Sequence, residues 1–410
     1  MKLLPIIYLG YMFVSIYFLS FFLLLYFKNK KQLFESPPLK KKYSVSFIVP
    51  AYNEGDTIKD TIEHIFDIDY PNIIQVIVVN DCSTDNTKEI VENLQKKYSK
   101  LILINNEKNL GNAAGTKNVG LKYAKGEVVV MVDADSYPAR DSLNKMLGFF
   151  EDKKVGAVTC PVFVRNTKTF IGKLQAIEYK TIAFMRKLLG YVDAIYVTPG
   201  PLAVYRRATL DDVGGFDEKN MTEDIEITWR LTAKGWDRKM ALSTQVSSTA
   251  PEKIWVWYRQ RRRWNIGGLQ CIAKYKSYFL KKGMVGMCIL PFFIFQFFLG
   301  IVGVGVFTYI LITKLISNYF FVNFSMQADV PLLTLENLSI TPSFLNYLGV
   351  ILFVTGTAFT LIILSKLKDD ALKKQNFFVI LFYSVIYLTV YPFIAIISIY
   401  KYFKGDNKWW

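Results

Sequence analysis

Four long apolar runs near the two ends of the chain constrain its fold more than any other feature. They cover residues 5–27, 285–313, 344–365 and 377–400. A helix needs about 20 mostly apolar residues to cross a bilayer, and each of these runs is long enough. We therefore divide the chain into a transmembrane helix (1–30), a linker (31–44), a cytosolic domain with interfacial helices (45–280) and a region of about three spans (281–410).

Basic residues next to these runs predict how they cross the membrane. Such lysines follow the first run and lie between the last two, namely Lys28, Lys30, Lys31, Lys366, Lys368, Lys373 and Lys374. Because basic residues favour the cytoplasmic side, these segments are expected in the cytosol and residues 314–343 outside. Four spans would place both ends of the chain outside, but Lys401, Lys404 and Lys408 argue against that, so the last span is the least secure. Pro291 is expected to divide the second run into an interfacial piece and a span.

The composition limits the class of protein. The chain is 52% hydrophobic and carries a net charge of +16, which suits a membrane protein with basic surfaces near anionic lipid and an anionic substrate. Nucleic acid is the other partner that such a charge would fit, but no nucleic-acid motif accompanies it, so none is expected. The four cysteines lie far apart and His64 is the single histidine. No zinc knuckle or disulfide framework is indicated, and histidine catalysis is nearly excluded.

Residues 45–165 alternate between strand and helix patterns. Strands are predicted at Val45–Val49, Gln75–Asn80, Leu101–Ile104, Val128–Asp133 and Val155–Val164. Helices are expected after caps at Asp56 or Thr57 and at Thr84 or Asp85, and over Asn112–Tyr123 and Ser142–Phe150. This rhythm predicts a doubly wound, mainly parallel α/β sheet.

The stretch GEVVVMVDADS, residues 126–136, places two carboxylates directly after a buried strand. Open α/β sheets bind ligands at the carboxyl ends of their strands. Asp133 and Asp135 therefore offer hard oxygen ligands to Mg²⁺ or Mn²⁺, a cation that completes its shell with substrate phosphates. The alternative is a solvated turn after the strand.

Further motifs follow in order. They are PAYNE (50–54), NDCSTD (80–85), NLGNAAGTKNVG (109–120), TPGPLAVYRR (198–207), TED (222–224) and QRRRW (260–264). In this order and spacing, from about Val45 to Leu269, the chain resembles family 2 glycosyltransferases, which are inverting enzymes of the GT-A fold. The resemblance implies a Rossmann-like mixed sheet that binds a UDP-sugar.

The resemblance also assigns roles at the donor end. It implies that Asp135 ligates the metal and that the nucleotide and sugar donor contact Ala51, Tyr52, Asn53, Glu54, Asp81, Asn112 and Asp133. Many polymerising members carry lysine where this chain has Asn112. One positive contact to the phosphates is therefore missing, or Lys117 replaces it.

The remaining motifs concern the acceptor. In the family, the aspartate of TED is the general base, so Asp224 takes that role with Glu223 beside it; the alternative is capping of a helix. Gly200 and Pro201 form a turn that brings backbone close to an acceptor sugar, or merely a turn before a strand.

QRRRW resembles the QxxRW motif of processive synthases, with Gln260, Arg263 and Trp264 matching. Trp264 would stack on the acceptor sugar and Arg263 would hold the diphosphate. The alternative is a basic patch that contacts lipid phosphates. Residues 170–192 form a basic amphipathic segment that either lies in the membrane interface or packs on the sheet as an ordinary helix.

Together these features predict a processive, inverting glycosyltransferase of the plasma membrane that extends a β-linked extracellular polysaccharide from a UDP-sugar, with N-acetylglucosamine the best candidate. Two alternatives stay open. One is a non-processive enzyme that adds one sugar to a lipid carrier, and the other is an inactive membrane partner of an export complex. The partners are therefore the donor, a glycan or lipid acceptor and membrane lipid, and a small helper subunit is left open.

Overall fold

A seven-stranded sheet forms the centre of the sheet domain in the computed structural model, which describes residues 3–328, 344–367 and 377–405. The strands are β1 (Val45–Ala51), β2 (Ile73–Asn80), β3 (Leu101–Asn105), β4 (Val128–Met131), β6 (Val155–Thr159), β8 (Ala203–Arg206) and β9 (Asp237–Met240). Their order is β3-β2-β1-β4-β8-β6-β9. All neighbours are parallel except β8, which runs antiparallel to β4 and β6. The predicted mainly parallel α/β sheet is confirmed, and β8 makes it mixed.

Helices cover both faces of this sheet because its central strands are apolar on both sides. One face packs against α2 (Ile58–Phe66), α3 (Thr87–Lys97), α5 (Ser142–Met146) and the 3₁₀ turn Leu147–Glu151. The other packs against α4 (Ala113–Tyr123), α7 (Arg207–Val213) and α8 (Glu223–Ala233). Alternate residues of β1 divide between the two cores, with Phe47 in the first and Ile48 in the second.

The predicted strand Val155–Val164 is wrong in one respect, because it is two strands in different sheets. β6 ends at Thr159, and β7 (Val162–Val164) joins a small sheet with β5 (Ser136–Pro138) and β10 (Val246–Ser248). Pro161 lies between them and has no N–H to continue a ladder. The small sheet carries Ser136 and Ser248 beside the predicted metal ligand.

Thr57 occupies the predicted N-cap position of α2 and Asn86, not Thr84 or Asp85, that of α3, but neither side chain makes a capping hydrogen bond. α3 begins at Thr87, later than expected, because the Asp85 carboxylate accepts hydrogen bonds from Thr87 N (3.0 Å) and Gly55 N (2.9 Å). Thr57 precedes α2, but its hydroxyl donates to Glu54 Oε2 (2.8 Å) instead of capping the helix. Asp85 thereby joins the loops after β1 and β2, whereas the Thr57 contact lies within the loop after β1.

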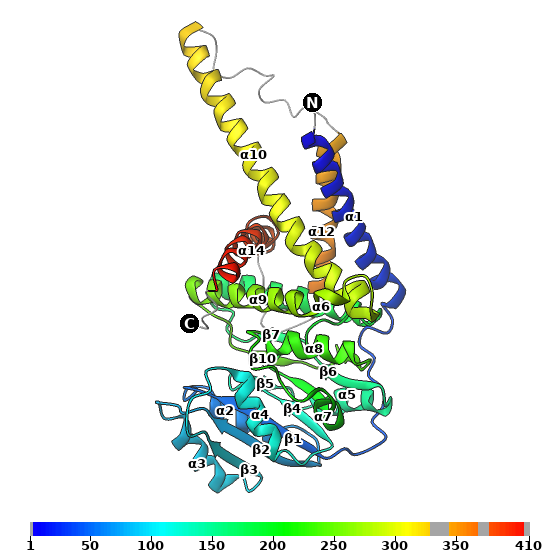
Figure 1. Ribbon diagram of the computed structural model, residues 1–410, viewed down its shortest axis with the longest axis vertical. Helices are drawn as coiled ribbons and strands as arrows, with labels where there is room; N and C mark the ends of the chain where they lie inside the picture. Colours follow the sequence, from blue (N-terminus) through cyan, green and yellow to red (C-terminus); the bar gives the residue numbers. More distant parts are fainter. Residues whose placement is uncertain (1–2, 329–343, 368–376, 406–410) are drawn as a thin grey trace.

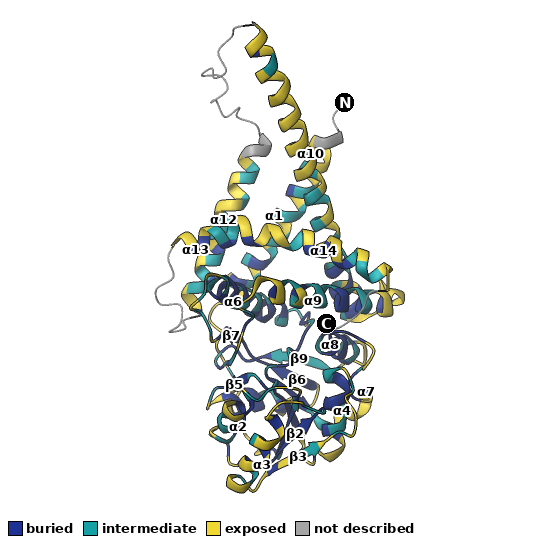
Figure 2. Cartoon of the chain, turned by 90° about the vertical axis from the view of Figure 1, so that its left-hand side faces the viewer, coloured by how far each residue is buried: buried dark blue, intermediate teal, exposed yellow. Residues whose placement is uncertain are grey.

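Two long helices, α6 (Phe170–Gly190) and α9 (Ile254–Tyr275), form a layer above the sheet domain (Figure 1). α6 is buried on several sides, since it packs on β7 and β9 below and on apolar helices above. Ordinary packing therefore accounts for the apolar residues of the amphipathic segment 170–192. Figure 2 shows the layer between the sheet domain, whose strands are largely buried, and the largely exposed upper helices.

Four helical segments are long and apolar enough to cross a membrane. They are α1 (Leu3–Asn29), α10 (Leu290–Ala328) with the π-helical turn before it, α12 (Phe344–Lys366), and α13 (Phe377–Phe382) continued by a π-helical turn and α14 (Leu388–Phe403). The first three rise steeply from the α6–α9 layer, whereas α13 and α14 lie across that layer (Figures 1 and 2). The exposed side chains of α10 and α12 are mostly large and apolar, as lipid-facing surfaces are.

Pro291 does not divide the second apolar run, contrary to the prediction from sequence. The π-helical turn Val285–Ile289 passes directly into α10, which continues past residue 313 to Ala328. A wider turn just before a proline relieves the clash of its ring with the preceding carbonyl groups. The expected outside segment 314–343 is therefore helical up to Ala328, and its later residues lie outside the described part of the chain.

Candidate active site

A cavity of about 760 Å³ lies at the carboxyl ends of β1, β2 and β4 and extends through the α6–α9 layer to α10 and α14. Nearly all of the predicted site residues line it: Ala51, Tyr52, Glu54, Asp81, Asn112, Asp133, Asp135, Gly200, Pro201, Glu223, Asp224, Gln260, Arg263 and Trp264. Motifs from both ends of the sheet domain's sequence, from Ala51 to Trp264, thus border one cavity. The cysteines are all free thiols, and His64 hydrogen bonds Asp60 O on α2 (2.7 Å).

Asn53 is the predicted donor residue that does not border the cavity. Its backbone is left-handed (φ 56°), and its side-chain Oδ1 accepts from Thr84 N (2.7 Å). Its own N–H donates to Ser83 Oγ (3.0 Å). Asn53 therefore joins the loops after β1 and β2, and its contact with the donor stays a prediction.

The donor end of the cavity holds Asp81 and Glu54. Asp81 is buried, and its carboxylate accepts from Asn106 Nδ2 (2.7 Å) and Leu110 N (3.0 Å), which fixes it against the third motif. Burial raises the pKa of Glu54 to about 7. Asn112 caps α4 by accepting from Gly115 N (2.7 Å), so helix capping accounts for its side chain.

Asp135 is the best candidate for holding a divalent cation. Its Oδ1 accepts from Ser136 Oγ (3.0 Å) and Ser248 Oγ (3.5 Å), and burial raises its pKa to about 6, with Asp133 adding to the effect. Within residues 3–328, 344–367 and 377–405, no three His, Cys, Asp or Glu side chains form a metal cage. A pair of carboxylates suits Mg²⁺ or Mn²⁺, which take their other ligands from phosphates and water.

Lys117 lies beneath the cavity and is almost completely buried. Its Nζ is 2.7 Å from Glu223 Oε1 and 3.7 Å from Asp133 Oδ1. Burial opposes the charge, but these carboxylates raise the pKa of Lys117 above its ordinary value. The geometry contradicts the suggestion that Lys117 replaces a phosphate-binding lysine, because it is engaged with two motifs of the protein itself.

Asp224 and Glu223, the two carboxylates of the TED motif, both border the cavity. Asp224 lies in the first turn of α8, where its Oδ1 accepts from Ile225 N (2.9 Å). Burial raises the pKa of Asp224 to about 6, and the negative charge of Glu223 contributes. Glu223, in contrast, has its pKa lowered by Lys117 despite burial. The two neighbouring carboxylates therefore differ, because Glu223 is held in an ion pair with Lys117 whereas the pKa of Asp224 is raised to about 6.

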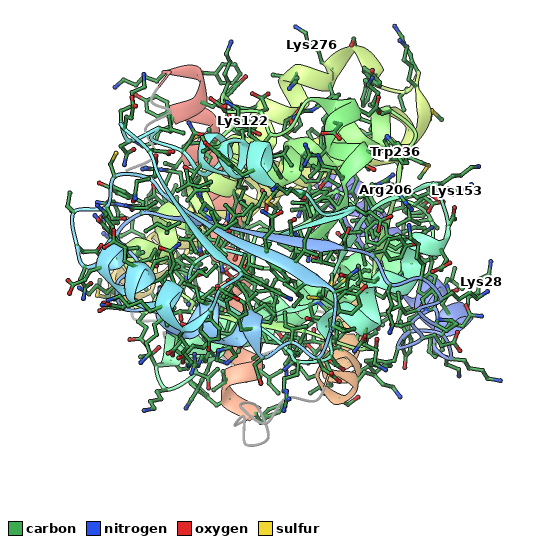
Figure 3. The ribbon with its side chains drawn as sticks, turned by 90° about the horizontal axis from the view of Figure 1, so that it is seen from below. Lys28, Lys122, Lys153, Arg206, Trp236 and Lys276 are labelled. Carbon is green, nitrogen blue, oxygen red and sulfur yellow. The ribbon has the colours of Figure 1, made fainter. Side chains whose placement is uncertain are left out.

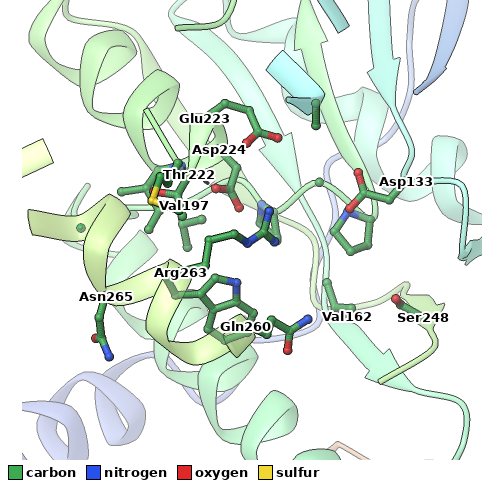
Figure 4. Close-up of a pocket in the computed structure, with 18 of the residues that line it drawn as sticks. Asp133, Val162, Val197, Thr222, Glu223, Asp224, Ser248, Gln260, Arg263 and Asn265 are labelled. Carbon is green, nitrogen blue, oxygen red and sulfur yellow. Dashed lines mark hydrogen bonds between the residues drawn. The ribbon is translucent and has the colours of Figure 1, made fainter. Parts of the chain in front are cut away.

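The QRRRW motif lies on α9 and presents three side chains to the cavity. Figure 4 shows the Arg263 guanidinium reaching between Asp224 and Asp133, with Gln260 beside it. The Trp264 ring lines the cavity and carries the Arg261 guanidinium 4.1 Å from its centroid. Arg261 itself is buried, so it does not belong to a basic patch that contacts lipid phosphates.

The upper end of the cavity is formed by residues that the motifs did not indicate. They include Arg186 and Tyr196 near α6, Phe293 and Phe297 on α10, and Tyr391 on α14. Arg186 is 6% exposed and its Nε has no hydrogen-bond partner among the described residues. The sequence did show Arg186 as one of the basic residues interleaved with apolar residues in segment 170–192. Such an amphipathic pattern alone does not show which side of the helix faces a cavity.

Comparisons with known proteins agree with this geometry. A family model described as "Glycosyltransferase like family 2" matches residues 42–267. The chain is 31% identical over 268 residues to the poly-beta-1,6-N-acetyl-D-glucosamine synthase of Staphylococcus epidermidis, which covers 64% of each sequence. It is 30% identical over 262 residues to the synthase of that name from Staphylococcus aureus, covering 63% of this chain and 62% of the relative. The matched region is thus less than two thirds of either relative.

A solved structure extends the comparison to almost the whole chain. The mannosyltransferase PcManGT from Pyrobaculum calidifontis superimposes with a TM-score of 0.61 at 21% identity, covering 98% of this chain and 99% of that one. At this identity the match concerns the fold, and it includes the apolar helices.

Proposed function

The chain belongs to glycosyltransferase family 2, and on that basis we propose that it transfers N-acetylglucosamine from UDP-N-acetylglucosamine to a growing β-linked polysaccharide. One observation carries the proposal: a single cavity joins the carboxylates at the strand ends, the TED base and the QRRRW helix. The choice of sugar and of a polymeric product is supported by relatives named poly-beta-1,6-N-acetyl-D-glucosamine synthase. Because these relatives match over part of their length, substrate and product remain our proposal.

The geometry of the cavity supports a single displacement with inversion. Asp224 takes the proton from the acceptor hydroxyl, whose oxygen attacks the anomeric carbon while the bond to UDP breaks. Arg263 donates hydrogen bonds to the diphosphate, and the exposed face of Trp264 stacks on the acceptor sugar. Asp135 would hold Mg²⁺ or Mn²⁺, which supplies neutralisation of the diphosphate charge when bound. The PcManGT structure, which has the same fold, is described as a complex with GDP-Man and Mn2+.

We further propose that α1, α10 and α12 cross the membrane and that α13 and α14 lie on its cytosolic side. With three crossings, Lys28, Lys366 and Lys401 all lie on the side of the sheet domain, as the preference of basic residues for the cytosol requires. Seen from below, Lys28, Lys153 and Lys276 project from the rim of the molecule (Figure 3). This arrangement removes the conflict that a fourth span creates with Lys401 and Lys404.

The test uses purified protein in phospholipid nanodiscs with Mn²⁺ and a panel of radiolabelled UDP-sugars. We expect UDP release and a high-molecular-weight labelled product from UDP-N-acetylglucosamine. Asp224→Asn should abolish both but still bind UDP. Release from a different donor would overturn the choice of sugar, and a product carrying one sugar would overturn processivity. No release from any donor would contradict the proposed activity.

A further inference from the structure

Glu178 is a buried carboxylate that the proposed reaction does not use. It lies in the middle of α6 and is 3% exposed. Its oxygens accept hydrogen bonds from Arg261 Nε (3.0 Å), Arg261 Nη2 (2.6 Å), Tyr387 Oη (2.7 Å) and Tyr391 Oη. The donors come from α9 and from the C-terminal apolar segment, so Glu178 joins three elements that are distant in sequence.

Burying such an ion pair is costly unless its geometry is good and its other hydrogen bonds are satisfied. Here two nitrogens of the Arg261 guanidinium donate hydrogen bonds to the Glu178 carboxylate, and the two tyrosine hydroxyls donate to its remaining lone pairs. Trp257 Nε1 donates to Tyr387 Oη (2.7 Å), and Arg261 Nε also donates to Tyr391 Oη (2.8 Å). Networks of this kind impose one arrangement on the elements that they connect.

Arg261 transmits this arrangement to the cavity. Neither Arg261 nor Glu178 lines the cavity, but Arg261 contacts two residues that do. Its Nη1 donates to Gln260 Oε1, and its guanidinium covers one face of Trp264. One face of the Trp264 ring is therefore fixed by the protein, which leaves the other face for a sugar.

We propose that Glu178, Tyr387 and Tyr391 are positioning residues that act through Arg261 to hold Gln260 and Trp264 in place for the acceptor. The segment from α13 to α14 then belongs to the catalytic unit, although its sequence alone predicts a membrane span. The inference rests on the proposed function, because it takes Gln260 and Trp264 to contact acceptor and diphosphate. Tyr391 also borders the cavity directly, next to the position where α10 and α14 cross at Gly300 and Pro392.

The experiment removes two hydroxyl groups and keeps the rings. The double variant Tyr387→Phe/Tyr391→Phe deletes two donors to Glu178, while the matched control Tyr400→Phe deletes a hydroxyl from an exposed tyrosine on α14. With a short N-acetylglucosamine oligomer as acceptor, we expect the double variant to lose about 10- to 100-fold in kcat over acceptor KM. Its affinity for UDP should stay close to wild type, because the nucleotide contacts lie at the strand ends.

A second measurement does not depend on the identity of the sugar. Hydrogen–deuterium exchange should become faster in residues 257–266 of the double variant, with β1, β2 and β4 unchanged. Wild-type transfer kinetics together with unchanged exchange in α9 would overturn the proposal, as would a parallel loss of UDP affinity. An inactive wild-type protein whose double variant still shows faster exchange in α9 would instead contradict the proposed function and leave the positioning contact supported.

Discussion

Gly200 lies against the carboxylate of Asp133, so closely that a β-carbon at Gly200 would come within 2.5 Å of Asp133 Oδ2. The turn of the TPGPL motif thus packs directly on the first aspartate of DADS. Both residues border the cavity, and Lys117 approaches the same carboxylate from below. The TPGPL turn and the loop after β4 therefore share one contact, which glycine alone accommodates.

The first prediction follows from this contact. Gly200→Ala should displace Asp133 and lower kcat over donor KM by about tenfold or more, because even a displacement near 1 Å is costly at a reacting centre. UDP release from the donor is the measurement. Gly305→Ala is the matched control, since nothing lies within 4 Å of a β-carbon at Gly305 on α10. Equal activity of the two variants would show that Asp133 tolerates the shift.

The second prediction concerns the buried ion pair of Lys117 and Glu223. Lys117→Met should destabilise the protein by about 3–5 kcal/mol, because it leaves a buried carboxylate without its partner. Adding Glu223→Gln should restore much of that loss, since the amide carries no charge to desolvate. Thermal unfolding of the two variants in the same detergent tests this. A double variant no more stable than Lys117→Met would contradict it.

The motif residues that line the cavity could be predicted from sequence, whereas the contacts that hold the QRRRW helix in place could not. Asp81, Asp133 and Asp135 follow apolar strands, and parallel strands bring their carboxyl ends to one edge. Glu178 meets Arg261 and Tyr391 across 83 and 213 residues, and no periodic pattern encodes that meeting. Sequence spacing predicts contacts that follow from a regular parallel sheet. It does not predict contacts between three helices that pack at arbitrary angles.

The apolar helices illustrate the same limit. Hydropathy finds all four long apolar segments, because length and composition suffice for that. It does not distinguish α10, which rises steeply, from α13 and α14, which lie across the α6–α9 layer (Figure 2). In this segment Tyr387 and Tyr391 donate hydrogen bonds to the buried carboxylate of Glu178, and hydropathy does not encode these contacts.

The third prediction is a pH dependence of turnover. A general base works only when deprotonated, so a pKa raised to about 6 for Asp224 places the acid limb of kcat near pH 6. The charges that act on Asp224 are Glu223 and Asp133, which raise its pKa, and Lys117 and Arg263, which lower it. Below the limb the rate should fall about tenfold per pH unit.

Glu223→Gln is the variant that checks this assignment. The substitution removes the negative charge of Glu223, which raises the pKa of Asp224, and it keeps the positive charge of Lys117, which lowers that pKa. The pKa of Asp224 should therefore fall. The acid limb should therefore move to lower pH, provided that turnover is measured at saturating donor and metal. A limb that stays in place would mean that another group sets it.

The fourth prediction separates stability from activity at Arg186. This buried guanidinium lines the upper part of the cavity, and its Nε is without a partner among the described residues. Burial lowers the pKa of Arg186, which reflects the cost of holding its charge there.

Replacing an incompletely paired buried charge by an apolar side chain of similar length often stabilises a protein. We expect Arg186→Met to melt at the same or a higher temperature than wild type but to transfer sugar more slowly, because the upper part of the cavity loses a hydrogen-bond donor. Arg259→Gln, on the exposed face of α9, should change neither. A variant that is both less stable and fully active would assign Arg186 to packing of the layer.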